Sequence, residues 1–149
     1  MYSYASEELI IGYDLLNEPV LPPGYSNTDL RSLYVRIITE IRALDTNHIV
    51  FIEGNWYATD FTSLTPPMNP NLVYAFHKYW SETTISTIQP YLNIRNEFNV
   101  PLWLGESGEN FNPWFYETIQ LMEENDIGNQ SVAYVDTDYK RTRWDIWQP

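Results

Sequence analysis

Four short apolar runs, each followed directly by a polar, acidic or aromatic cluster, constrain the fold of this chain more than any other feature. The runs are Leu9–Ile11, Ile49–Ile52, Leu72–Phe76 and Pro101–Leu104. Short apolar stretches that are rich in β-branched or aromatic residues and end at Gly, Pro, Asn or Asp are typical of buried strands. Parallel strands covered on both faces have continuous apolar sequences of this kind. We therefore expect four strands of one parallel sheet.

Amphipathic segments separate the first run from the second and the third from the fourth. Apolar residues recur with helical spacing from Leu30 to Leu44, and a second helix is expected from about Ile85 to Asn99. Asn112 and Pro113 are typical of a helix cap and a first helical position, so a third helix is expected after the fourth run. Repeated strand–helix units predict an α/β fold in which the carboxyl ends of all strands lie at one edge of the sheet.

The composition excludes several kinds of partner and site. The 149 residues carry a formal net charge of −12 and include six Trp, twelve Tyr and no Cys. The acidic balance argues against a nucleic-acid partner and against an anionic membrane surface. Without Cys there is no disulfide, no thiolate metal ligand and no cysteine nucleophile. No apolar run approaches the roughly 18 residues that span a membrane, and the length suits one domain with its own core.

Two carboxylates end two different predicted strands, and their placement indicates a specific chemistry. Glu18 lies in Asn-Glu-Pro after the first run, and Glu106 lies in Gly-Glu-Ser-Gly after the fourth. Pro19 favours an extended backbone at Glu18. Paired carboxylates suit glycoside hydrolysis, where one donates a proton to the leaving oxygen and the other attacks the anomeric carbon. A carboxylate separation of ~5 Å implies retention of configuration, and one of ~7–9 Å implies inversion.

Aromatic and polar residues gather at the same strand ends. Flat rings there can stack on sugar faces; the candidates are Trp56, Tyr57, Tyr79, Trp80 and Trp114. His77 ends the third run, and we expect it in the site. Glu53 also ends a strand, and we expect it to act through hydrogen bonds to other site residues rather than directly on a substrate.

The segments GYDLLNEP, HIVFIEGNWYATDF, FHKYW and PLWLGESGEN together resemble glycoside hydrolase family 5, the cellulase and endoglucanase group. The resemblance runs from about Leu9 to Gly128 and implies part of a TIM (β/α)8 barrel, about strands four to seven. It implies a retaining enzyme, mostly secreted, that uses no metal and no other cofactor, although this chain shows no signal peptide. By motif, Glu18 matches the acid/base, Glu106 the nucleophile, Asn17 the residue that holds the sugar 2-hydroxyl, and His77 and Tyr79 residues that line the site. Trp56 and Trp80 would contact the polysaccharide or oligosaccharide substrate.

The resemblance begins at the fourth strand of such a barrel. A complete barrel takes about 250 residues, so four or five strands would leave two sheet edges and an apolar inner face open. We expect the chain to need the missing barrel half or to self-associate, and to be weakly active or inactive alone. Residues 1–128 are expected to form the barrel fragment. Residues 129–149 are expected to be a divergent tail, with a faint similarity to the start of a β-sandwich carbohydrate-binding module.

Two other functions stay open at this point. A non-catalytic carbohydrate-binding fragment would use Trp56, Trp80 and Trp114 as platforms, and it would bind glucan even with Gln in place of Glu18 and Glu106. A nucleotide-binding α/β domain is disfavoured, because the chain has neither a Gly-x-Gly-x-x-Gly nor a Gly-x-x-x-x-Gly-Lys loop. The glycan stays open among cellulose, mannan, xyloglucan and other β-glucans, as does the choice between internal and terminal cleavage.

Overall fold

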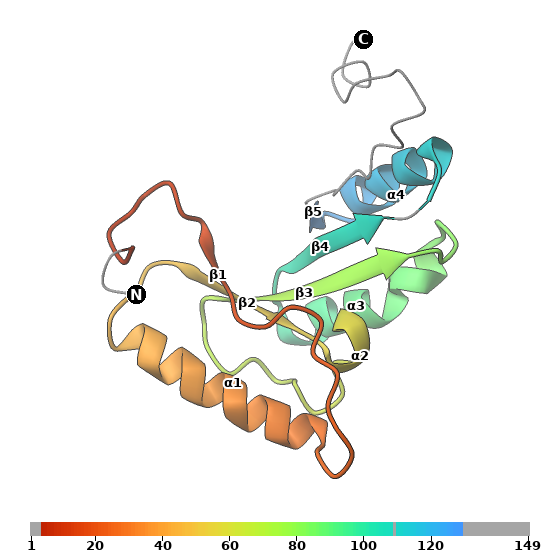
Figure 1. Cartoon of the computed structure of the whole chain (residues 1–149). Coiled ribbons are helices and arrows are strands. Elements are labelled where there is room, and N and C mark those ends of the chain that lie inside the picture. Colours follow the sequence, from red (N-terminus) through yellow and green to blue (C-terminus); the bar gives the residue numbers. More distant parts are fainter. Residues whose placement is uncertain (1–3, 109, 130–149) are drawn as a thin grey trace.

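One parallel sheet is the framework of residues 4–108 and 110–129, which a computed structural model describes (Figure 1). Apart from residue 129, the expected tail of residues 129–149 lies outside the described residues. The strands of the sheet follow the order of the sequence: β1 (Gly12–Asp14), β2 (Ile49–Glu53), β3 (Leu72–Tyr79), β4 (Leu102–Gly108) and β5 (Gly128–Asn129). The helices between them are α1 (Asn27–Arg42), the short α2 (Asn55–Ala58), α3 (Ile85–Phe98) and α4 (Asn112–Glu124). The expected α/β class is confirmed, and the sheet corresponds to half of a barrel.

Local sequence signals explain where the long helices begin. The carboxylate of Asp29 accepts hydrogen bonds from the backbone N–H and the hydroxyl of Ser26 at 2.8 Å each, which caps the start of α1. In α4 the cap position is Phe111, one residue earlier than we expected, so that Asn112 is already helical and Pro113 lies in the first turn. Proline is tolerated there because first-turn N–H groups have no intrahelical partner. Among the described residues, no helix has the length and apolar character that crossing a membrane requires.

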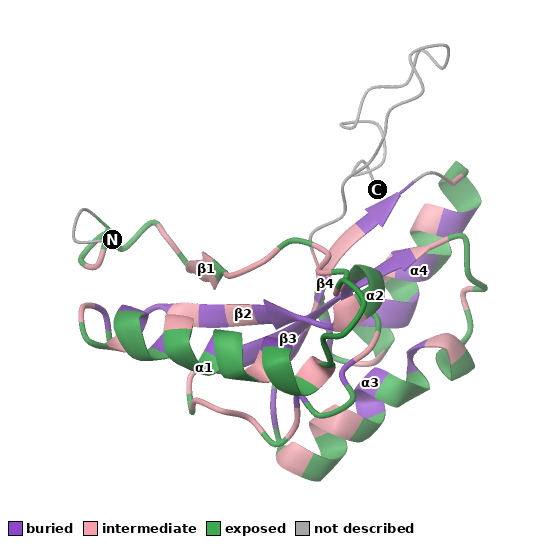
Figure 2. Ribbon diagram, turned by 60° about the horizontal axis from the view of Figure 1, so that its bottom comes forward, coloured by how far each residue is buried: buried purple, intermediate pink, exposed green. Residues whose placement is uncertain are grey.

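The hydrophobic core lies between one face of the sheet and the helices. Figure 2 shows β3 as a largely buried strand and β2 as a strand of alternating buried and intermediate residues, with α1 and α3 below them. Side chains of alternate strand residues point toward the helices, and they include Val50, Ile52, Tyr74, Phe76, Leu102 and Leu104. The ring of Phe76 stacks on that of Tyr91 from α3, with centroids 4.1 Å apart. Phe51 and Trp103 lie on the opposite, inner face, meet edge to face at 5.9 Å and remain partly exposed.

The first strand differs from the expectation. The apolar run Leu9–Ile11 precedes the strand, which begins at Gly12, and Leu9 and Ile11 are 91% and 71% exposed. Strand pairing is decided by a partner, and the register places Gly12 opposite Ile49 at the start of β2. Before that point, the carbonyl of Ile11 still accepts the N–H of Ile49 at 3.2 Å, but the paired register begins only at Gly12. Because β1 lies at the edge of the sheet, no second neighbouring strand extends it toward the apolar run.

Candidate active site

The parallel topology brings Glu18 and Glu106 together from positions 88 residues apart (106 − 18). Glu18 follows β1, and Glu106 lies near the end of β4, so both reach the carboxyl edge of the sheet. One oxygen from each carboxylate and one ring nitrogen of His77 all lie within 4.8 Å of one another. The two carboxylate side chains are 28% and 34% exposed, which leaves both accessible to a substrate.

His77 is the buried centre of this cluster. Its Nδ1 lies 2.8 Å from Oε1 of Glu18 and 3.7 Å from Oε2 of Glu106, and its Nε2 lies 3.2 Å from Oε1 of Glu53. The pairing of β3 with β4 shifts by one residue between Phe76 and His77, because Gly105 of β4 is left without a partner, and this places His77 opposite Glu106. Bulges of this type re-aim side chains beside active sites. A Cβ on Gly105 would lie only 3.1 Å from Nε2 of His77, so the glycine leaves the imidazole room.

Three carboxylates decide the charge of His77. Burial opposes a charged imidazole, but hydrogen bonds to Glu53 and Glu18 and the charges of Glu53 and Glu106 outweigh burial and raise the pKa of His77 to about 9. At neutral pH the ring is therefore an imidazolium that donates from both nitrogens. Glu18, His77 and Glu106 are close enough to ligate a cation, but a protonated imidazole has no lone pair to offer a metal.

Glu53 contacts both the loop that carries Glu18 and the ring of His77, as expected from its place at a strand end. It is almost fully buried at the end of β2. Its Oε2 accepts the backbone N–H of Glu18 at 2.6 Å while its Oε1 faces His77. The hydroxyl of Tyr34 from α1 donates to the Glu53 carbonyl at 2.9 Å. One buried carboxylate therefore links the loop after β1 to the imidazole on β3.

The backbone at Glu18 is not extended, contrary to the expectation from Pro19. Its φ of 45° is in the left-handed region, which is uncommon for a residue other than glycine. The hydrogen bond from the Glu18 N–H to Glu53 offers a local reason, because it fixes the peptide in this orientation. Strained residues of this kind occur where the surrounding structure over-determines them, often at active sites.

Asp14 is a site residue that sequence reasoning did not single out. Although the residue is exposed at the edge of the sheet, its carboxyl group shares a hydrogen bond with Glu53. Burial of the carboxyl group and, next to it, the negative charge of Glu53 raise the pKa of Asp14 to about 7. One sequence signal could have indicated this position. Side chains alternate along a strand, and Asp14 is paired with Phe51, whose ring lies on the inner face.

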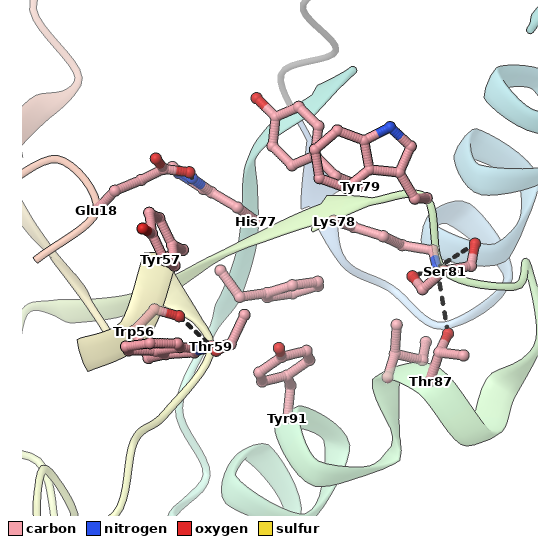
Figure 3. A pocket seen from close by; sticks show the side chains of 13 residues that line it. Glu18, Trp56, Tyr57, Thr59, His77, Lys78, Tyr79, Ser81, Thr87 and Tyr91 are labelled. Atoms are coloured by element: carbon pink, nitrogen blue, oxygen red, sulfur yellow. Dashed lines mark hydrogen bonds and ion pairs between the residues drawn. The ribbon is translucent and has the colours of Figure 1, made fainter. Parts of the chain in front are cut away.

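Tyr79 and two exposed tryptophans complete the surroundings of the carboxylates. The Tyr79 hydroxyl donates to Oε2 of Glu106 at 2.9 Å. A cavity of about 680 Å³ opens beside Glu18 and His77, and Figure 3 shows Trp56 and Tyr57 on one side of it and Tyr79 on the other. Trp56 and Trp80 line this cavity and are 62% and 70% exposed. Asn17 is exposed beside Glu18, but neither Asn17 nor Glu106 lines the cavity.

Trp56 and Tyr57 are presented by an unusual turn. Three successive residues, Trp56, Tyr57 and Ala58, have φ values of 55°, 59° and 60°, so the single turn of α2 is left-handed. Asn55 holds it, since its side-chain oxygen accepts the N–H groups of Leu21 at 3.1 Å and Trp56 at 2.8 Å. A left-handed turn of residues with side chains is costly. In this turn the rings of Trp56 and Tyr57 are exposed.

The expectation that Trp114 forms a sugar platform is wrong. Trp114 is only 5% exposed. Its Nε1 donates to the carbonyl of Ser81 at 2.7 Å, so the ring is part of the packing between α4 and the loop after β3. A sequence position after a strand cannot distinguish a ring that faces solvent from one that a helix carries back into the core.

The charge on His77 predicts a pH dependence of stability. Its pKa is raised from 6.5 to about 9 by folding, so the folded state binds more protons than the unfolded state between these values. The resulting stabilisation, about 3 kcal/mol in order of magnitude, is complete below pH 6.5 and is lost as the pH rises through 9. Urea unfolding from pH 6.5 to 8 should therefore show falling stability in the wild type.

The His77→Gln variant is the control for this pH dependence, because it removes the imidazole and leaves the other titratable groups in place. Asp14, whose pKa is raised to about 7 by folding, also lowers stability as the pH rises, but it does so in both proteins, so stability should still fall less steeply in the variant from pH 6.5 to 8. Lys78 acts in the opposite direction above pH 8, since burial lowers its pKa from 10.5 to about 8. Equal slopes in the two proteins below pH 8 would contradict the assignment of the charge to His77.

A pair of accessible carboxylates at the carboxyl edge of a parallel α/β half-barrel is an arrangement that many glycosidases use. The family model described as Cellulase (glycosyl hydrolase family 5) matches residues 2–148. The chain therefore belongs to glycosyl hydrolase family 5.

Three relatives illustrate the match. A β-xylosidase of Phanerodontia chrysosporium is 33% identical over 92 residues, which cover 60% of this chain and 19% of that protein. XacCel5A, solved in complex with cellopentaose, has a TM-score of 0.73 and 20% identity, over 93% of this chain and 55% of its own. Endoglucanase Cel5A of Thermotoga maritima has a TM-score of 0.70 and 16% identity, over 83% of this chain and 52% of its own. The chain thus spans about half the length of these solved structures and a fifth of the xylosidase.

Proposed function

We propose that the chain supplies the catalytic pair of a retaining glycoside hydrolase that acts on a β-linked polysaccharide. The observation that carries this proposal is the presence of carboxylate oxygens of Glu18 and Glu106 within 4.8 Å of each other. That separation suits a nucleophile that bonds to the sugar, and it leaves too little room for the water that an inverting enzyme places between its carboxylates.

The proposed reaction proceeds in two displacements. Glu106 attacks the anomeric carbon while protonated Glu18 gives its proton to the leaving glycosidic oxygen, so that the glycosidic bond breaks as the ester to Glu106 forms. Glu18, now a carboxylate, takes a proton from water, which attacks the same carbon and releases the sugar and Glu106. The Tyr79 hydroxyl, 2.9 Å from Glu106 Oε2, orients the nucleophile, and the His77 imidazolium holds Glu18 at 2.8 Å.

The stereochemistry of the product tests the proposal. Proton NMR of cello-oligosaccharide cleavage should show the β anomer first, with the α anomer appearing only through mutarotation. Early α product would contradict the assignment of Glu106 as nucleophile. We expect the chain alone to release reducing sugar slowly, because the opposite half of a barrel mouth is not part of the described sheet. Rapid turnover by purified monomer would contradict that expectation.

Trp56 and Trp80 are proposed as sugar platforms beside Glu18, and Asn17 as the partner of the sugar 2-hydroxyl. Each Trp→Ala change should weaken cellopentaose binding about 5- to 30-fold, which corresponds to about 1–2 kcal/mol for a lost ring face. Isothermal calorimetry measures this change. Tyr116→Ala, on the exposed side of α4, is the matched control and should bind like wild type. Unchanged affinity in both tryptophan variants would contradict the proposal that these rings bind the sugar.

A non-catalytic carbohydrate-binding role is the second candidate, favoured by the open aromatic cavity of about 680 Å³. Glu18→Gln and Glu106→Gln separate the two functions. Under the catalytic proposal both variants lose hydrolysis and keep binding. Under the binding-only role, the wild type binds glucan and shows no hydrolysis that depends on either carboxylate.

The open inner face of the sheet is proposed to be covered by a further barrel half or by a second copy of the chain. Phe51 and Trp103 on that face are partly exposed, as are Leu9 and Ile11 beside edge strand β1. Exposed apolar surface and unpaired strand edges favour association. Light scattering on the purified chain should give a mass above the 17.6 kDa of one copy. A monodisperse monomer at about 100 µM would contradict self-association.

A further inference from the structure

Lys78 is a buried lysine whose partners are all uncharged. It lies in β3 between His77 and Tyr79, and strand alternation sends its side chain away from the inner face on which His77 lies. Its Nζ donates to Oγ of Ser81 at 2.6 Å and to the carbonyl of Glu82 at 2.6 Å. Within residues 4–108 and 110–129, no carboxylate lies within ion-pair distance of this ammonium group.

Such a placement opposes folding. A buried ammonium loses its hydration, and without a carboxylate nearby it regains only part of that energy through hydrogen bonds. Burial accordingly lowers the pKa of Lys78 to about 8. The ring of Trp114 lies 5.5 Å away and adds a cation–π contact. The group therefore calls for an explanation other than stability, and its hydrogen bonds point to the loop that follows β3.

That loop, residues 80–84, begins with a strained turn. Trp80 has a φ of 49°, and the N–H of Ser81 donates to the carbonyl of Tyr79 at 2.5 Å across it. This is a γ-turn with a positive central φ, a rare and strained conformation. Strain persists only where the surroundings over-determine it. The turn places Trp80, 70% exposed, on the cavity that Glu18 also lines.

Side chains from three elements hold the loop, and one of them is Glu117 of α4, which accepts the Thr83 hydroxyl at 2.6 Å. Lys78 reaches it from β3, as Figure 3 shows in the contacts of its amino group with Ser81 and Thr87. Trp114 donates from α4 to the carbonyl of Ser81 at 2.7 Å, and the hydroxyl of Thr87 donates from α3 to the carbonyl of Glu82 at 3.1 Å. Lys78 is the central member, since it contacts Ser81, Glu82 and Thr87 and lies against the ring of Trp114.

We propose that Lys78 is a positioning residue, whose ammonium group fixes the loop after β3 so that Trp80 stays over the cavity as a platform for the sugar next to Glu18. The sugar role rests on the proposed function, because Glu18 lines this cavity and Glu106 does not. Under that function the sugar on the side of the proton donor belongs to the leaving group. Lys78 then affects substrate binding through Trp80, without touching the reacting atoms.

The first test needs no substrate. Hydrogen exchange of the Ser81 amide, which donates to the Tyr79 carbonyl across the turn, should be at least tenfold faster in K78M, while exchange in β2 and α1 stays as in wild type. R36M, on the exposed side of α1, is the matched loss of a positive charge and should leave the loop unchanged. K78R keeps the charge and should recover most of the protection. Wild-type exchange of the loop in K78M would overturn the proposal.

The second test measures coupling to Trp80. Cellopentaose should bind K78M about tenfold more weakly than wild type, W80A should lose a similar factor, and the double variant should be no weaker than W80A. The unfolding free energy of K78M should not fall below that of wild type, because a buried charge is removed. If the double variant lost affinity by the product of the two single factors, the two residues would act independently, and the positioning role of Lys78 would be overturned. If wild type bound no cellopentaose, the proposed function would lose its support, and the exchange measurement would still decide whether Lys78 holds the loop.

Discussion

Replacing Glu106 by Gln should lower hydrolysis of a dinitrophenyl β-cellobioside by about 10³-fold or more, since residual catalysis without a nucleophile rests on binding alone. The substitution preserves shape and keeps an acceptor for the Tyr79 hydroxyl, which lies 2.9 Å from Oε2 of Glu106. What it removes is the negative oxygen that must form the bond to the anomeric carbon. The rate is measured as release of dinitrophenolate at high protein concentration.

Glu18→Gln should give a different pattern, and the contrast makes the test specific. Dinitrophenolate leaves without a proton, so the first displacement should survive and appear as a burst. Cleavage of cellopentaose, whose leaving oxygen needs that proton, should fall by about 10²–10⁴-fold. Glu40→Gln, exposed on α1, is the control for removing one carboxylate. Loss of the burst in Glu18→Gln together with its survival in Glu106→Gln would reverse the two roles.

Glu53→Leu should destabilise the fold by about 1–3 kcal/mol, because a buried N–H of His77 loses its acceptor while Glu18 and Glu106 still offset part of the charge of the ring. The contact that is lost joins the His77 imidazolium to Oε1 of Glu53 at 3.2 Å. The change also removes the acceptor of the Glu18 N–H, now held at 2.6 Å, so hydrolysis should fall with stability. Urea unfolding at pH 7 gives the free energy of unfolding.

Two variants separate this effect from the loss of any acidic residue. Glu40→Leu removes an exposed carboxylate from α1 and should change stability by less than about 0.5 kcal/mol. Glu53→Gln keeps the acceptor oxygen and should cost less than Glu53→Leu. In Glu53→Gln, NMR titration should show the pKa of His77 below its raised value of about 9, because the Glu53 charge is one of the groups that raise it. An unchanged pKa of His77 in that variant would contradict the role of Glu53 in raising it.

Local chemistry along the chain was sufficient to predict much of the architecture. The apolar runs at Ile49–Ile52 and Leu72–Phe76 lie in β2 and β3, and the expected helix from Ile85 is α3. Strand and helix periods depend on side-chain patterns within a few residues, which a sequence contains in full. The parallel order then followed from the alternation of elements, and with it the meeting of Glu18 and Glu106 at one edge.

The sequence could not predict features that depend on contacts between distant elements. Strand β1 begins where β2 offers a partner rather than at its own apolar run. Trp114 is buried because the loop after β3 provides an acceptor for its indole N–H. The left-handed backbone of Glu18 overrides the preference set by Pro19 because Glu53, 35 residues away, accepts its N–H.

The sequence by itself therefore determined which residues have suitable chemistry: two carboxylates, a histidine, a tyrosine and aromatic rings at the ends of strands. Only the tertiary structure decided their state. The imidazole of His77 is charged because folding surrounds it with Glu18, Glu53 and Glu106, and Lys78 contacts Ser81 and Glu82 because the loop after β3 folds back over it. Protonation and position are set by groups that burial brings together from separate strands, and no single stretch of the chain contains that information.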